Sequence, residues 1–116
     1  AGTVSGEVNF SADWPTGYDD VLIVLMSSDN PSVPSQPVSM QTLTAEANDF
    51  ELATPVGQDY YLAVYGFPYN FADPYQDFYG GYGWDWNSMD FTLSPVQLID
   101  ETSFLTGLEI QCRNQE

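Results

Sequence analysis

Apolar and polar residues alternate with a period of two along several short segments of the chain. The pattern is clearest in residues 3–10, where Val4, Gly6, Val8 and Phe10 fall on one side and polar residues on the other. Such alternation is typical of a β-strand with one buried face. Similar patterns predict further strands at residues 38–44, 50–53, 60–65, 89–94 and 104–112.

The segment Val21–Met26 is an unbroken apolar run instead. It is short and rich in β-branched residues, which predicts a central strand buried on both faces. In the last predicted strand, Phe104, Leu108, Ile110 and Cys112 fall on one face. A brief pairing is also expected within Val96–Ile99.

Proline and glycine separate these segments, and no segment has convincing helical periodicity. All 8 prolines fall between the predicted strands, where a missing N–H breaks no sheet hydrogen bond. The pattern therefore predicts an all-β fold, a seven-stranded and mostly antiparallel β-sandwich. At 116 residues the chain is expected to form a single domain, residues 1–116.

The segment 67–88 stands apart because it holds nine of the eighteen aromatic residues, with Gly80, Gly81 and Gly83 as expected flexible joints. We expect one long aromatic loop here. Its side chains have three alternative roles: a satellite core beneath the loop, a protein–protein contact, or a platform that stacks on sugar rings. Tyr82, Trp84 and Trp86 alternate and would share one face of an extended segment. The candidate contact residues are Tyr75, Phe78, Tyr79, Tyr82, Trp84 and Trp86.

The charge balance narrows the possible partners. The chain carries 17 acidic residues against one basic residue, Arg113, and its net charge is −16. Nucleic acids and anionic membranes are excluded as partners because both require basic patches. No apolar run approaches the ~20 residues of a membrane span, so membrane insertion is not expected. The self-repulsion must be relieved by salt, by bound cations or by spreading the charge over loops.

Aspartates accumulate in two of the predicted loops. If the strands alternate in direction, the loops at 13–20 and 67–86 lie at the same end of the sandwich. Calcium takes six to eight oxygen ligands, and clustered aspartates on loops can supply them. Ca²⁺ is therefore a candidate cofactor, and the alternative is that these carboxylates are simply solvated. The candidate ligands are Asp13, Asp19, Asp20, Asp73, Asp77 and Asp85.

Catalysis is not expected. The chain has no histidine and no lysine, so most pairings of a nucleophile with a base are missing. Cys112 lies in a predicted strand, where a lone cysteine is more often a small buried hydrophobe than a reactive thiol. Paired carboxylates could hydrolyse glycosides, but a sandwich of this size offers little room for the cleft.

Three segments resemble a known family. Gly2–Phe10 resembles the opening strand of transthyretin-like sandwiches, which include carboxypeptidase regulatory-like and Cna-B-like domains. Pro55–Val64 resembles their later turn and strand, and Thr106–Ile110 their last strand. The resemblance implies a non-catalytic extracellular domain used as a stalk, spacer or assembly module. The aromatic segment departs from the family pattern, and the absence of lysine leaves no isopeptide crosslink to assign.

Together these observations predict a secreted or cell-surface structural protein. The first residue, Ala1, directly precedes a strand, as expected of a mature secreted chain after signal cleavage. The sharper expectation is a self-assembling subunit of a filament or surface layer, with calcium as a candidate stabilising ion. One alternative is a carbohydrate-binding module that uses Tyr82, Trp84 and Trp86 on a glycan. Another is a spacer domain of a larger secreted protein.

Overall fold

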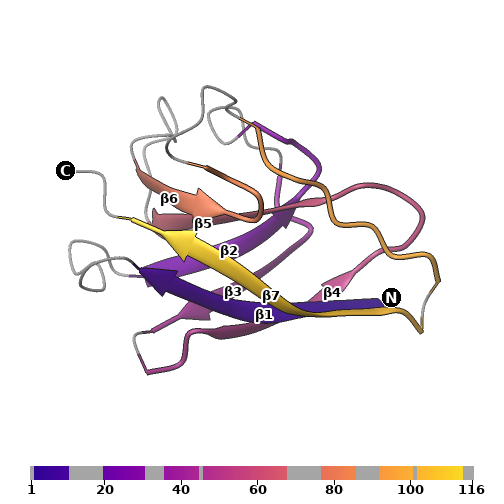
Figure 1. Ribbon diagram of the computed structural model, residues 1–116, viewed down its shortest axis with the longest axis horizontal. Coiled ribbons are helices and arrows are strands. Elements are labelled where there is room, and N and C mark those ends of the chain that lie inside the picture. Colours follow the sequence, from indigo (N-terminus) through magenta and orange to yellow (C-terminus); the bar gives the residue numbers. More distant parts are fainter. Residues whose placement is uncertain are drawn as a thin grey trace.

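Two β-sheets packed face to face form the computed structural model of the chain (Figure 1). The structure describes residues 2–10, 20–30, 36–44, 46–67, 77–85, 92–100 and 102–113, and no helix occurs among them. The all-β sandwich predicted from the alternation is confirmed. The strands are β1 (Gly2–Phe10), β2 (Asp20–Met26), β3 (Ser39–Leu43), β4 (Asp49–Thr54), β5 (Tyr61–Phe67), β6 (Phe78–Gly81) and β7 (Phe104–Cys112).

The two sheets differ in size and share no strand. The three-stranded sheet has the order β4-β1-β7, and the four-stranded sheet has the order β3-β2-β5-β6. The first and last strands, β1 and β7, are parallel neighbours. The other four pairings are antiparallel. Every pairing therefore fits strands that alternate in direction along the chain.

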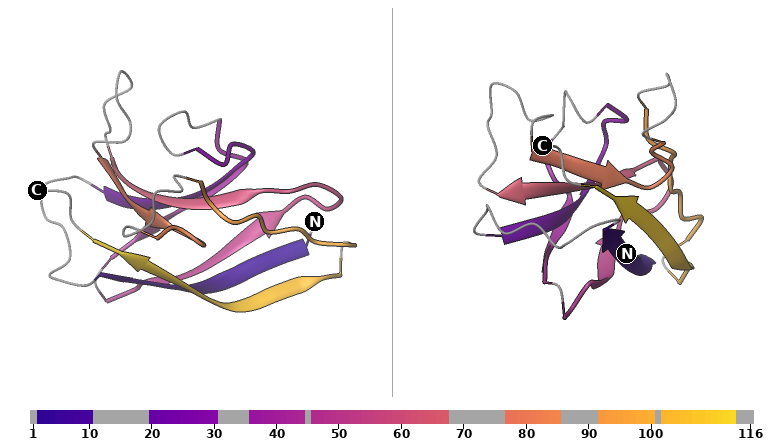
Figure 2. Two further views of the ribbon diagram at one scale, coloured as in Figure 1. Left: turned by 45° about the horizontal axis from the view of Figure 1, so that its top comes forward. Right: turned by 60° about the vertical axis from the view of Figure 1, so that its left-hand side comes forward.

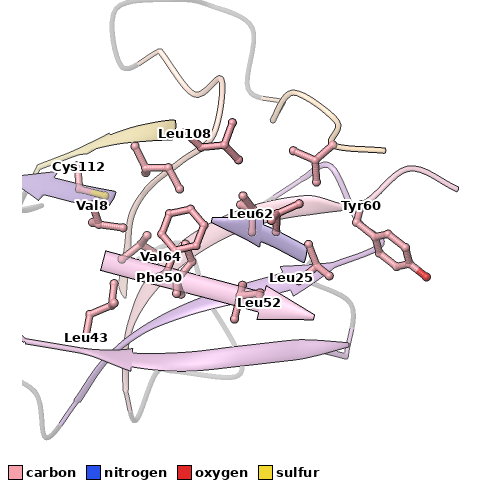
Figure 3. Packing of buried hydrophobic residues seen from close by; sticks show 14 of the residues in the cluster. Val8, Leu25, Leu43, Phe50, Leu52, Tyr60, Leu62, Val64, Leu108 and Cys112 are labelled. Atoms are coloured by element: carbon pink, nitrogen blue, oxygen red, sulfur yellow. The ribbon is translucent and has the colours of Figure 1, made fainter. Parts of the chain in front are cut away.

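The main core lies between the two sheets (Figure 3). Strand β4 shows how alternation builds this core. Phe50 and Leu52 point into the core, whereas Asp49 and Glu51, which alternate with them, are exposed. The remaining strands contribute their own alternate apolar residues to the same layer, among them Val8, Leu25, Leu62, Val64, Leu108 and Ile110.

A second apolar layer covers the outer face of the four-stranded sheet. Strand β2 sends Ile23 and Leu25 into the main core and Val24 and Met26 into this second cluster. Strand β5 divides its residues in the same way. The prediction that Val21–Met26 is a central strand buried on both faces is therefore confirmed, since β2 lies between β3 and β5.

The second half of one predicted strand is wrong, and another strand was missed. Residues 92–94 of the strand expected at 89–94 are not in a strand, and residues 89–91 lie outside the described residues. The seventh strand is instead β6, which falls inside the segment expected to be one long loop. The brief pairing expected near Val96 is confirmed, since Tyr60 and Val96 exchange two backbone hydrogen bonds of 2.8 and 2.9 Å.

Side chains join the facing edges of the two sheets between β3 and β4. The Gln41 side chain donates from Nε2 to the Asp49 carbonyl (2.8 Å) and accepts from the Glu51 N–H (3.0 Å). The Ser39 hydroxyl donates to the Ala53 carbonyl (2.6 Å). These bonds occupy outward backbone groups of β4, which would otherwise be open to another strand.

Three carboxylates form one row across the outer face of the three-stranded sheet. Glu7 of β1 lies directly opposite Asp49 of β4 on one side and Glu109 of β7 on the other. Directly opposed side chains on one face lie about 4.5–5.5 Å apart, and like charges at that spacing are destabilising. The row therefore opposes folding through its repulsion.

We predict that Glu7→Gln raises the free energy of unfolding by about 0.5 kcal/mol at low ionic strength, because it removes repulsion on both sides. The gain should shrink in high salt, which screens exposed charges. Urea denaturation at two salt concentrations measures both effects. The matched control is Glu46→Gln, which removes an exposed carboxylate outside the strands. An equal gain in the control would assign the effect to net charge instead of the row.

Candidate functional site

The two aspartate-containing loops leave the four-stranded sheet side by side. Asp20 at the start of β2 pairs with Phe67 at the end of β5. The loop before Asp20 and the segment after Phe67 therefore start from neighbouring positions at one end of the sandwich. The residues that adjoin the two segments thus lie at one end of the sandwich, and that the aspartates come together stays a prediction.

The structure places three of the six candidate calcium ligands. Asp20 and Asp85 are exposed, whereas Asp77, directly before β6, is buried. Asp13, Asp19 and Asp73 lie outside the described residues. Within the described ranges, no group of three or more His, Cys, Asp or Glu residues is arranged to hold a metal ion. The calcium site stays a prediction.

The aromatic residues that follow Asp77 are buried. Phe78 is fully buried on the outer face of the four-stranded sheet, where it meets Trp84 edge to face with ring centroids 4.9 Å apart. The ring of Tyr65 of β5 also contacts Phe78, with ring centroids 5.5 Å apart. Trp84 is only 8% exposed and packs in the same cluster with Leu93. These side chains cover the outer face of the sheet.

The next residue of β6 points the opposite way, into the main core. Tyr79 is buried there and contacts the ring of Phe10 edge to face at 5.3 Å. Tyr82 is partly buried against the same core. The β6 strand thus contributes one aromatic ring to each apolar layer.

The candidate contact role therefore needs a correction for three of the six residues. Phe78, Tyr79 and Trp84 lie in the two cores because β2 and β5 are apolar on both faces and need a cover. Phe78 and Trp84 fit the first of the three alternative roles of the aromatic segment, a satellite core. Tyr75 and Trp86 lie outside the described residues.

Two glycines allow this segment to pack so closely. A Cβ atom on Gly81 would collide with the Leu62 carbonyl of β5. Gly83 has φ +78°, and a Cβ there would collide with Ser94. These glycines are needed for close approach and a left-handed turn, which is more specific than the flexible joints expected from sequence.

We predict that Trp84→Ala destabilises the protein by about 3–5 kcal/mol, because it leaves a cavity between Phe78 and Leu93. Chemical denaturation measures the loss. The matched control is Met40→Ala, which truncates an apolar side chain that is 54% exposed. It should change stability far less. Equal effects of the two substitutions would contradict a core role for Trp84.

Among the described residues, the most exposed large apolar side chains lie at the opposite end of the sandwich. Ile99 is 88% exposed and Phe104, the first residue of β7, is 73% exposed. Phe104 pairs with Thr3, and Leu98 approaches Gly2, so both residues lie beside the start of β1. We call Ile99 and Phe104 the apolar end. Sequence reasoning did not identify it.

A β-bulge explains why Phe104 was placed on the wrong face. The register between β1 and β7 shifts between Val4 and Gly6, opposite Leu105 and Leu108. Gly107 lies in this shift with φ +73°. The extra residue reverses the alternation, so Leu105 packs on the core and Phe104 points outward. A glycine inside a strand pattern was the available signal for a bulge.

A hydrogen-bonded turn links the two residues of the apolar end. The Asp100 carboxylate accepts from the Thr102 N–H (2.9 Å), the Thr102 hydroxyl (2.7 Å) and the Ser103 hydroxyl (3.2 Å). These bonds favour the ionised carboxylate and lower the pKa of Asp100, with the Thr102 hydroxyl as the largest cause. These bonds tie Asp100, next to Ile99, to Ser103, next to Phe104.

Cys112 ends β7 with its side chain in the main core. It is buried, and this burial raises the pKa of its thiol well above the ordinary value. A thiol that stays protonated is a poor nucleophile and a poor metal ligand. Cys112 is therefore a small buried hydrophobe, as expected from its position in a strand pattern.

We predict that Cys112 is not labelled by thiol reagents in the native protein, because labelling requires the core to open. Labelling should become complete in denaturant. Thr42→Cys supplies an exposed thiol on β3 as a positive control and should react at once. Rapid native labelling of Cys112 would show that this part of the core opens easily.

No helix in the described ranges is long and apolar enough to cross a membrane. Comparison with family models, curated proteins and solved structures finds no match for this chain. The resemblance to transthyretin-like sandwiches therefore stays a prediction.

Proposed function

We propose that this protein is a non-catalytic extracellular structural protein, a subunit that self-assembles into a filament or surface layer. The observation that carries the proposal is the apolar end, where Ile99 is 88% and Phe104 is 73% exposed. Both residues flank one turn beside the start of β1, and exposed apolar side chains at one end of a fold favour a protein contact there. The hydrogen bonds from Thr102 and Ser103 to the Asp100 carboxylate order residues next to the pair, and such local order lowers the entropic cost of binding.

The burial of Trp84 favours assembly over carbohydrate binding. A sugar platform needs exposed aromatic faces, and Trp84 is 8% exposed while Tyr82 is partly buried. This leaves Tyr82 as the one described member of the proposed sugar-binding trio with a substantial exposed surface. The glycan module therefore becomes the weaker alternative.

The chemistry of the side chains supports a non-catalytic role. The chain has no histidine or lysine, and the thiol of Cys112 is buried with a raised pKa. General bases and activated nucleophiles at neutral pH usually come from these residue types.

The net charge of −16 makes assembly depend on the ionic conditions. Free subunits repel one another, and cations or salt reduce that repulsion. Calcium held by the acidic loops would act in the same direction. We propose calcium as a stabilising ion on this ground, with Asp20, Asp77 and Asp85 among its candidate ligands.

We predict that the purified protein forms regular polymers in about 1 mM calcium, a level suited to extracellular calcium modules, and that chelator shortens or dissolves them. Light scattering and negative-stain imaging measure particle size in both conditions. Magnesium at the same concentration separates calcium binding from simple screening of charge.

If the polymers persist in chelator, the protein self-assembles but calcium does not control its assembly. A protein that stays monomeric at high concentration in calcium and in salt would overturn the proposed function. A glycan screen would then be the next experiment, with Tyr82 as the described residue to change.

A further inference from the structure

The strand edges of the two sheets differ in how well they are covered. A strand edge presents unpaired N–H and C=O groups that can pair with another chain. Between β3 and β4, the side chains of Gln41 and Ser39 hydrogen-bond the Asp49 and Ala53 carbonyls and the Glu51 N–H. A new strand could add here only by displacing them.

The other pair of facing edges, β6 and β7, is joined at one end only. The Arg113 N–H donates to the Tyr79 carbonyl of β6 at 3.0 Å. A Cβ atom on Gly80 of β6 would touch the Gln111 carbonyl of β7, so β6 lies directly against that residue. The last residues of β7 are therefore covered by β6.

The first part of β7 has no such cover among the described residues. Within the described ranges, no backbone hydrogen bond joins residues 104–110 to a strand other than β1. In the left view of Figure 2, β7 forms the lower border of the molecule. Phe104, the aromatic residue of the apolar end, is 73% exposed and lies at the start of this open edge.

We propose that the open edge of β7 pairs with the same edge of a second copy of this chain, with the Phe104 side chains buried in the contact. This inference rests on the proposed function and names its interface. Side chains of β3 bond the outward backbone groups of β4, so these two edges face each other, and β6 lies against the end of β7. Strands β1, β2 and β5 are paired on both sides. The matching open edge on another copy is therefore β7 itself.

Pairing between identical edges is isologous and follows a two-fold axis. The two β7 strands then run antiparallel, and the axis passes near the middle of residues 104–110. The three-stranded sheets of two copies join into one continuous sheet. This dimer is the building block of the assembly, and further growth uses other surfaces.

The composition of β7 suits contact between two acidic chains. Its nine residues include one acid, Glu109, so the edge adds little local repulsion to the net charge of −16. The bulge at Gly107 interrupts the regular pattern of edge groups, and bulges are a common guard against unwanted pairing. The backbone bonds alone therefore form a short ladder, and burial of Phe104 supplies the remaining affinity.

Cysteine crosslinking tests the geometry of the pair. Thr106→Cys places an exposed thiol near the proposed two-fold axis, whereas Thr42→Cys places one on the covered β3 strand. The native Cys112 is buried and should not interfere. Under mild oxidation, Thr106→Cys should give a disulfide-linked dimer as its main product, and Thr42→Cys should stay mainly monomeric. Equal crosslinking of the two variants, or none in Thr106→Cys, would overturn the proposal.

Sedimentation of charge variants tests the energetic role of Phe104. Phe104→Glu should weaken the dimer by about tenfold or more, as expected for an anchor residue buried in an interface. Met40→Glu adds the same charge at another exposed apolar position and should weaken it far less. Circular dichroism checks that both variants are folded.

The results of these experiments distinguish failure of the β7 interface from failure of the proposed function. If the wild-type protein assembles and Phe104→Glu assembles equally well, the β7 interface is wrong and self-assembly stands. If the wild-type protein stays monomeric at every concentration and salt tested, the interface and the proposed function both fail.

Discussion

The fold depends on the burial of β2 and β5 on both faces. A sheet of this kind cannot expose its outer side to water, because Leu22, Val24 and Met26 there are as apolar as the residues facing the main core. The chain meets this requirement with Phe78, Trp84 and Leu93, which lie over that face. Gly81 and Gly83 are then required, because a side chain at either position would prevent the close approach.

This constraint changes the functional meaning of the aromatic residues. A run of tyrosine, phenylalanine and tryptophan indicates a binding surface when the rest of the chain can bury its own apolar residues. Here the four-stranded sheet needs Phe78 and Trp84 for its own cover, so aromatic content alone does not identify a binding surface. In the part of the chain that the structure describes, the most exposed apolar side chains are instead Ile99 and Phe104, outside the aromatic segment.

Most of the fold could be predicted from the sequence because alternation records burial directly. The bounds of β7 match the prediction at both ends, and the continuous apolar run of β2 correctly indicated two buried faces. Strand β6 was missed because two of its four residues are glycine. Its other two residues, Phe78 and Tyr79, point to opposite sides of the sheet. Phe104 was misplaced because one bulge at Gly107 reverses the parity of the residues before it.

The candidate sites were harder to predict because they depend on register. The bonds of Gln41 to β4 and the row formed by Glu7, Asp49 and Glu109 join residues far apart in sequence. Spacing along the chain carries no information about such pairs until the strand order is known. The same is true of the covered and open edges on which the proposed interface rests.

The parallel pairing of β1 and β7 has a mechanical consequence. Strand β1 begins at the end of the sandwich where β7 also begins, and β7 finishes at the other end, beside Phe10. A force that pulls Gly2 and Cys112 apart therefore slides these two neighbours along each other. In this direction the hydrogen bonds of the pair are loaded together, whereas a hairpin pulled at its open end loses them one after another. The geometry suits a subunit that carries tension along its length.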